Sequence, residues 1–157
     1  MDIVCYATSL SRWLFNAELQ RVFGLLVNDP RFGVDCLVSA MLDFGVGHAT
    51  FTCSMQVAPF QQVHLAGLAG HIELSEAPFN PPTDLPCVVS LQRGGEVRRL
   101  ELDVCNQYTI QGDRFAEAIL LETPVPIPLE DAVRNMEVIE ALVASGCSGG
   151  WVRPGGR

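Results

Sequence analysis

Lysine is absent from the 157 residues: all ten basic residues are arginine. Asp and Glu together number 18, which gives a formal net charge of −8 at pH 7. Proteins that bind nucleic acid usually carry a basic stripe, so this charge balance excludes a nucleic-acid partner. The missing lysine also removes a common acid/base group from any catalytic set that this chain provides.

Long apolar runs are missing as well. No stretch approaches the roughly 18 consecutive apolar residues of a membrane span, and no charged segment followed by an apolar one resembles a secretory signal. The sequence therefore predicts a cytoplasmic protein without a membrane partner. Hydrophobic residues make up 48% of the chain, which excludes disorder and favours one domain over residues 1–157. The Gly-rich segment 149–157 is predicted to be a flexible tail.

Metal-ligand spacings are absent. No two cysteines form a C-x-x-C pair, so six reduced, mostly buried thiols are expected in a cytoplasmic protein. The three histidines fall on separate predicted strands, where solvent-facing or core-edge positions are more typical than metal ligation. We therefore expect no metal site. These residues are Cys5, Cys36, Cys53, Cys87, Cys105, Cys147, His48, His64 and His71.

Apolar and polar residues alternate over much of 18–104, most clearly over 48–57. This period of two predicts half-buried strands, and short connections favour antiparallel neighbours. Helical spacing predicts helices over 1–15, 112–122 and 129–145, the last ended by Gly146. The fold class is therefore α+β, with one large, mainly antiparallel open sheet, helices on one face and no Rossmann domain. The predicted strands are 19–28, 35–44, 48–57, 61–68, 70–75, 86–92 and 96–104.

The uncovered face of such a sheet needs a partner, and a homodimer formed through this open face is expected. The turn Gly45-Val46-Gly47 superficially resembles a dinucleotide-binding glycine turn. That fingerprint requires a helix after the turn, whereas an alternating strand follows here, so a hairpin is predicted. The chain alone is therefore not expected to bind a dinucleotide cofactor.

Asp2 and Tyr6 are the candidate site residues. They lie four residues apart on one side of the first predicted helix, next to its expected buried stripe. A tyrosine hydroxyl can exchange a proton with a substrate alcohol if a nearby cation lowers its pKa, and an aspartate can orient either group. The alternative is that Asp2 caps the helix and Tyr6 packs at its edge. The expected stripe consists of Ile3, Ala7, Leu10 and Leu14.

Several segments, in order, resemble the C-terminal domain of the glucose–fructose oxidoreductase / inositol dehydrogenase (Gfo/Idh/MocA) family. Residues 1–7, Met-Asp-Ile-Val-Cys-Tyr-Ala, are similar to the Met-Asp-x-Gly-x-His/Tyr segment that opens the helix after the family's Rossmann domain. Tyr6 points to the dihydrodiol dehydrogenase-like branch. Val4 stands where the family usually has glycine. The other similar segments are 12–15, 67–74, 77–80, 107–119 and 126–142.

The resemblance implies an NAD(P)-dependent oxidoreductase that moves a hydride between a sugar or other secondary alcohol and the nicotinamide. Asp2 would be the orienting carboxylate and Tyr6 the acid/base hydroxyl, beside a lysine of a Glu-Lys-Pro motif. This chain has neither that lysine nor a Rossmann fingerprint, so we expect a substrate and oligomerisation domain that is inactive alone. Three alternatives remain open: a fragment of a longer chain, a non-catalytic dimerisation or ligand-binding module, and complementation by a Rossmann domain in trans.

Overall fold

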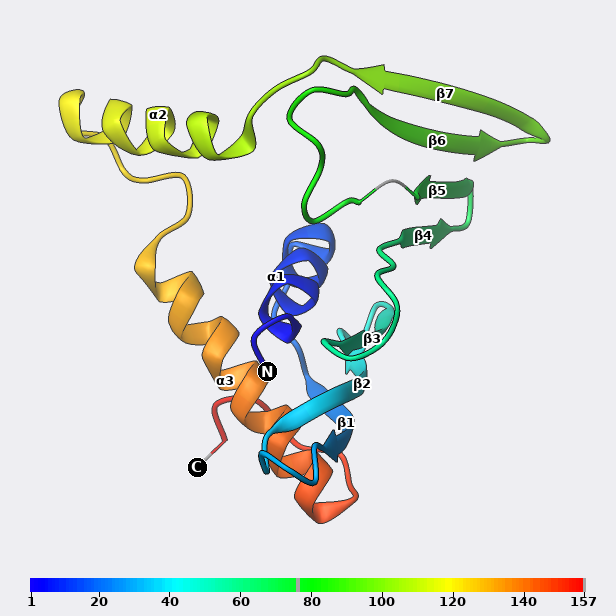
Figure 1. Ribbon diagram of the computed structural model, residues 1–157, viewed down its shortest axis with the longest axis vertical. Helices are drawn as coiled ribbons and strands as arrows, with labels where there is room; N and C mark the ends of the chain where they lie inside the picture. The colour runs from blue at the N-terminus through cyan, green and yellow to red at the C-terminus, as the bar shows by residue number, and fades with distance from the viewer. Residues whose placement is uncertain (76, 157) are drawn as a thin grey trace. The chain divides into compact units, whose positions relative to one another are not determined.

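The computed structural model describes residues 1–75 and 77–156, and Figure 1 shows its helices and strands in chain order. All seven predicted strands are present, with ends that differ from prediction by up to three residues. The helices are α1 (Val4–Phe15), α2 (Gln107–Leu120) and α3 (Leu129–Ser148). The strands are β1 (Arg21–Asn28), β2 (Asp35–Asp43), β3 (His48–Ser54), β4 (Val63–Gly67), β5 (Gly70–Leu74), β6 (Cys87–Arg93) and β7 (Glu96–Leu102).

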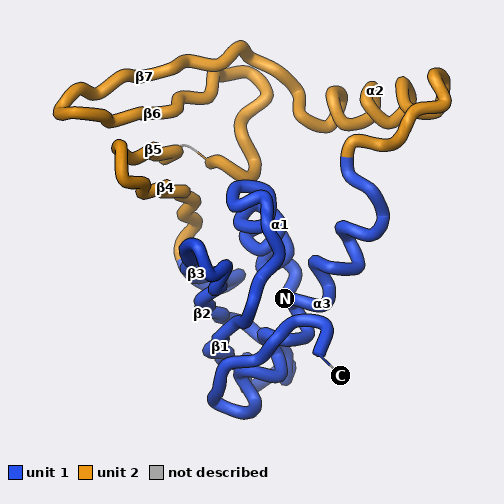
Figure 2. The backbone as a smooth tube through the Cα atoms, turned by 180° about the vertical axis from the view of Figure 1, so that it is seen from behind, with its two compact units in different colours: residues 1–57, 127–157 blue, residues 58–126 orange. Residues whose placement is uncertain are grey.

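The chain divides into two compact units, coloured separately in Figure 2. Unit 1 comprises Met1–Val57 and Ile127–Arg157, and unit 2 comprises Ala58–Pro126. The α+β class with antiparallel pairing is confirmed, but the strands form two sheets, β1-β2-β3 and β4-β5-β6-β7, rather than the single large sheet predicted. Residues 55–62, between β3 and β4, include Pro59, which has no amide hydrogen to continue a ladder.

The core of unit 1 lies between its three-stranded sheet and the helices α1 and α3. The register places Gly24, Ala40 and Phe51 opposite one another, so their side of the sheet carries the core residues. The helices therefore cover one face of this sheet and leave the other face open. The fully buried side chains of the core are Val4, Val22, Val38, Leu42, Val138 and Leu142.

Two glycines let α3 lie close against β1. A Cβ on Gly24 would come within 2.9 Å of the Leu142 carbonyl oxygen, and a Cβ on Gly146 would meet the Leu26 side chain. Gly146 was predicted to end this helix, but it lies inside α3. Gly149, with φ of 69°, is the left-handed C-cap instead, a backbone conformation that glycine adopts without a steric penalty.

The buried side of α1 differs from the predicted stripe. Val4, Thr8, Ser11 and Arg12 are buried, whereas Ile3, Ala7 and Leu10 are half-buried and Leu14 is exposed. Three of the four buried residues are polar or charged, so an apolar pattern could not identify this side of the helix. The predicted helix is confirmed, but its predicted orientation is wrong.

Unit 2 contains the four-stranded sheet and α2. The prediction placed the start of α2 near Gly112, but the helix begins at Gln107. Asn106 is its N-cap, with a side chain that accepts the amides of Tyr108 and Thr109. Asn is among the strongest N-cap residues, and this position was the sequence signal for the earlier start.

The segment predicted to be a flexible tail is bonded to β1 at one point. Val152 and Val22 exchange two backbone hydrogen bonds, with N···O distances of 2.7 and 2.9 Å. The amide of Gly24, two residues along β1, donates to the Ser145 hydroxyl at 2.9 Å. These bonds use some of the backbone groups on the free edge of β1. Without them, these groups could pair with a strand of another chain.

Candidate functional site

The first turn of α1 carries both candidate site residues. Asp2 is exposed and lies in the turn before the helix, and Tyr6 is 55% exposed in its first turn. The N-cap position belongs to Ile3, and no side chain caps the helix. Asp2 therefore does not make the capping hydrogen bond that would explain its presence structurally. Both polar groups are accessible to a molecule that approaches this end of α1.

Val4, at the position where the similar family has glycine, lies on the opposite side of the helix from this accessible surface. Its side chain is 1% exposed and belongs to the hydrophobic core of unit 1. The added side chain thus contributes to packing under the helix and does not cover Tyr6.

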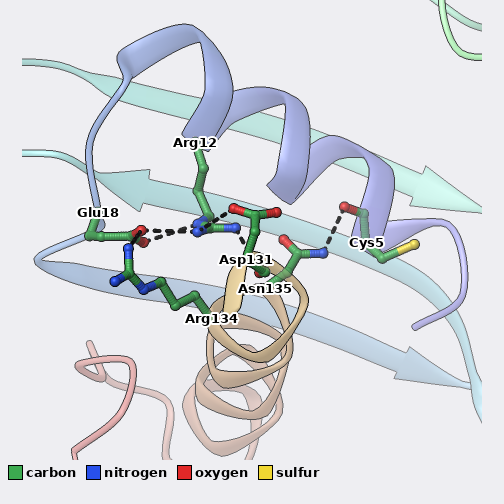
Figure 3. A network of polar contacts seen from close by, with 6 residues as sticks. All are labelled: Cys5, Arg12, Glu18, Asp131, Arg134 and Asn135. Carbon is green, nitrogen blue, oxygen red and sulfur yellow. Dashed lines mark hydrogen bonds and ion pairs between the residues drawn. The ribbon is translucent and has the colours of Figure 1, made fainter. Parts of the chain in front are cut away.

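A charged network fixes α1 on α3 (Figure 3). The Arg12 guanidinium, almost fully buried, donates from Nε and Nη2 to the two carboxylate oxygens of Glu18, at 3.0 and 2.9 Å. Its Nη2 also lies 2.8 Å from Asp131 Oδ1, in the first turn of α3. Such a bidentate contact is the strongest geometry for a guanidinium and a carboxylate.

Two further contacts extend this network. Arg134 of α3 binds Glu18 at 3.0 Å, and Asn135 Nδ2 donates to the Cys5 carbonyl oxygen at 3.2 Å. The hydrogen bond from Arg12 lowers the pKa of Glu18, and the same bond raises the pKa of Arg12. Both groups therefore stay charged at neutral pH. The contacts reach α1 at Cys5 and at Arg12, so they fix the helix turn from which Tyr6 projects.

The network was not found from the sequence. Arg12 and Asp131 are 119 residues apart, and no motif spacing connects them. The one available signal in the sequence was that Arg12 lies on the same side of α1 as Thr8 and Ser11, so that this side of the helix is polar.

The thiols are less buried than predicted: Cys105 and Cys147 are exposed, and the other four cysteines are half-buried. Burial raises the pKa of Cys5 and of Cys53. A raised pKa disfavours the thiolate, which is the reactive form of cysteine. These two thiols are therefore poor nucleophiles at neutral pH.

The three histidines are exposed on β3, β4 and β5, in agreement with the solvent-facing positions predicted. Within residues 1–75 and 77–156, no three His, Cys, Asp or Glu side chains come together as a metal-binding group. None of the helices in this part of the chain is long and apolar enough to cross a membrane.

The N-termini of α2 and α3 do not fit the diphosphate of a nicotinamide cofactor. The Gly45-Val46-Gly47 turn leads into β3, which confirms the predicted hairpin. At α2, the Asn106 side chain occupies the free amides. At α3, Glu130 and Asp131 place negative charge in the first turn. A phosphate requires free amides and the positive end of the helix dipole, preceded by a glycine-rich loop.

Comparison with known proteins shows which proteins this chain is similar to. Residues 1–73 match the model of the GFO/IDH/MocA C-terminal domain family. A curated relative, the uncharacterized oxidoreductase ORF334 of Rhizobium meliloti, is 35% identical over 156 residues, which are 96% of this chain and 46% of the relative.

Solved structures share the fold. The aldose-aldose oxidoreductase of Caulobacter crescentus, in complex with glycerol, has a TM-score of 0.83 at 24% identity, over 95% of this chain and 45% of that one. KijD10, a 3-ketoreductase from Actinomadura kijaniata in complex with NADP and TDP-benzene, gives 0.83 at 24% identity, over 92% and 45%. The chain spans about half the length of these relatives. The chain is therefore similar to GFO/IDH/MocA oxidoreductases, and the family's C-terminal domain model matches its residues 1–73.

Proposed function

We propose that this chain supplies the substrate-side, proton-handling surface of an NAD(P)-dependent oxidoreductase that acts on a sugar or another secondary alcohol. The observation that carries the proposal is the accessible pair Asp2 and Tyr6 on a helix that the Arg12 network holds in place. Rigid placement matters because acid/base catalysis requires hydrogen-bond contact between the catalytic group and the proton it transfers. The tyrosine also favours the dihydrodiol dehydrogenase-like branch of the family.

The division of labour follows from the chemistry of these two residues. The Tyr6 hydroxyl accepts the proton of the substrate alcohol during oxidation and returns it during reduction. A nearby cation assists this role, because it stabilises the phenolate that forms when the hydroxyl gives up its own proton. Asp2 orients the cation or the substrate hydroxyl. The sequence contains no lysine, so we assign that cation and the cofactor to polypeptide outside these 157 residues, in the same chain or in trans.

A non-catalytic module is the second candidate. It is favoured by the N-termini of α2 and α3, which do not fit the cofactor diphosphate. In that case Asp2 and Tyr6 would be ordinary surface residues, and their replacement would change no activity. The two candidates therefore differ in one measurable property, the effect of Tyr6 on turnover.

We further propose that the open face of the β1-β2-β3 sheet, on the side away from α1 and α3, forms a homodimer. Leu25 is 61% exposed on this face and Met41 41% exposed. A shallow hollow there is lined in part by Phe23, Leu25, Met41 and Thr50. A self-complementary patch of this kind suits a two-fold interface.

The first experiment is calorimetric titration of NADH and of NADPH into the purified chain. No heat is expected, and micromolar binding of either nucleotide would disprove the assignment of the cofactor to other polypeptide. The second experiment uses a chimera in which this chain replaces the matching part of the Rhizobium meliloti relative. It is assayed for nicotinamide reduction with a panel of aldoses and secondary alcohols.

In the chimera, Tyr6→Phe is expected to lower kcat by about 10²-fold or more, the usual contribution of a positioned acid/base group. Trp13→Phe, an exposed change on the same helix, is the control. If Tyr6→Phe and Trp13→Phe leave the rate equally unchanged, the non-catalytic module is the correct assignment. If Tyr6→Phe alone removes activity, the acid/base role is supported.

A further inference from the structure

Strand β7 is an open edge of the four-stranded sheet. It is the last strand in the order β4-β5-β6-β7, and all seven of its residues, Glu96–Leu102, are exposed. The edge strand β1 of unit 1 is not open in this way, because Val152 and Ser145 form hydrogen bonds with backbone groups on its free edge. An open edge with free backbone groups offers a template for another strand.

The register of the β6–β7 hairpin determines which backbone groups of β7 are free. Gly94 and Gly95, both with positive φ, form the two-residue turn between Arg93 and Glu96. Residues that flank such a turn exchange both hydrogen bonds, and such pairs alternate along the ladder. The backbone of Arg98 and of Leu100 therefore bonds to β6. The amides and carbonyls of Val97, Arg99 and Glu101 point to the free edge.

Side chains on β7 alternate in the same way. Arg99 lies in a row with Ser90, Glu73 and His64, on the polar face of the sheet, and Glu101 shares this face. Leu100 lies on the opposite face, in a row with Val89. None of the ion pairs among the residues that the structure describes involves Arg99 or Glu101.

From this pattern we infer that β7 pairs antiparallel with β7 of a second copy of the chain, about a two-fold axis at Leu100. In this register the free backbone of Arg99 meets that of the partner's Glu101, and the reverse pair completes the contact. Each pair exchanges two backbone hydrogen bonds and an ion pair on the polar face. Leu100 meets its own copy on the apolar face. The two sheets then form one continuous sheet.

Neighbouring registers are disfavoured by charge or by backbone geometry. An axis at Arg99 brings two arginines together, and an axis at Glu101 brings two glutamates together. A shift of one residue opposes a free backbone group with one already bonded to β6. Charges on an edge strand commonly prevent aggregation. Here their order allows one pairing between copies and opposes its neighbours.

A disulfide across the two-fold axis tests this register directly. Leu100 and its copy form a non-hydrogen-bonded pair with Cα atoms about 4.5 Å apart, a separation that a disulfide can span. In a Cys105→Ser, Cys147→Ser background, the Leu100→Cys chain is expected to form a covalent dimer under mild oxidation. Val97→Cys, an exposed position on the same strand, lies opposite residue 103 of the partner and is expected to give none. Equal yields from both would overturn the register.

Charge reversal then tests the ion pairs in the Leu100→Cys chain. Arg99→Glu or Glu101→Arg alone makes both contacts repulsive, because the two-fold axis repeats each change, and should slow cross-linking at least about ten-fold. The double variant R99E/E101R restores opposite charges and should recover the rate. An equal mixture of the two single variants should cross-link as heterodimers. If the double variant stays as slow as the single ones, with unchanged circular dichroism, the proposed pairing is wrong.

Discussion

Two buried hydroxyl groups of unit 1 lie in opposite hydrogen-bonding situations. Thr8 is fully buried, and its Oγ1 has no partner among the residues that the structure describes. Ser145 is equally buried, but its Oγ accepts the Gly24 amide at 2.9 Å and donates to the Gly150 carbonyl at 2.6 Å. An unpartnered buried hydroxyl costs free energy, whereas removing a bonded one leaves its partners unpaired.

Thr8→Val is therefore expected to raise the free energy of unfolding by about 1 kcal/mol, because valine keeps the shape and removes the hydroxyl. Ser145→Ala is the matched variant and is expected to lower it by about 1–3 kcal/mol. Urea unfolding followed by tryptophan fluorescence measures both, since Trp13 and Trp151 belong to unit 1. If both variants lower the free energy of unfolding by similar amounts, the predicted difference between Thr8 and Ser145 is wrong, and a water molecule bound to the Thr8 hydroxyl is indicated.

At the scale of the element, the Arg12 network connects α1 to α3 through one buried cation and two partly exposed carboxylates. The Arg12 side chain is 5% exposed, against 49% for Glu18 and 34% for Asp131. Removing a carboxylate leaves a buried charge without compensation, whereas removing the arginine leaves two carboxylates that water can reach. Removing the carboxylates should therefore lower the free energy of unfolding more than removing the arginine.

The double variant Glu18→Gln, Asp131→Asn is expected to lower the free energy of unfolding by about 3 kcal/mol or more, and Arg12→Met by less. The folded-state pKa of Glu18 is lowered, so its stabilising contribution is present above its unfolded value of about 4.3 and is lost as the pH falls. Urea unfolding between pH 7 and pH 3 should show a steeper acid loss in the wild type than in Arg12→Met. Parallel pH profiles would contradict this role.

The sequence predicted the elements of this fold better than their assembly. Alternation along single segments, as in 48–57, depends on local burial, so each strand could be located. The division into two sheets depends on whether β3 and β4 are hydrogen-bonded neighbours. A period of two along each strand does not contain that information. The orientation of α1 was missed for a related reason. Arg12 is buried because Glu18 and Asp131 compensate its charge, and Asp131 is distant in sequence.

For the candidate site, too, the local features were predicted from the sequence and the tertiary contacts were not. Asp2 and Tyr6 lie within one helical turn, and their spacing with the family motif was enough to select them. Their support from α3, through Asn135 and Asp131, belongs to tertiary structure. The hairpin at Gly45-Val46-Gly47 was predicted from a local feature, the strand after Gly47, which the structure contains as β3.

At the scale of the whole molecule, two separate surfaces of the chain are proposed to contact a second copy. One is the open face of the β1-β2-β3 sheet in unit 1, and the other is the β7 edge in unit 2. Each would form a two-fold contact, so together they would generate tetramers or longer assemblies, whereas either alone gives a dimer. The mass in solution therefore reports how many of the two contacts form.

Leu25→Glu is expected to remove the open-face contact, because it places a charge at the exposed apolar centre of that interface. The variant should fold normally, since Leu25 is 61% exposed in the single chain. Sedimentation equilibrium at micromolar concentration should then give a mass no greater than that of a dimer and lower than that of the wild type, and Val46→Glu, in the β2–β3 turn, should leave the mass unchanged. An unaltered mass for Leu25→Glu would exclude the face as an interface. Because Leu25 belongs to unit 1 and Leu100 to unit 2, the Leu25→Glu variant should still cross-link through Leu100→Cys, which separates the two contacts.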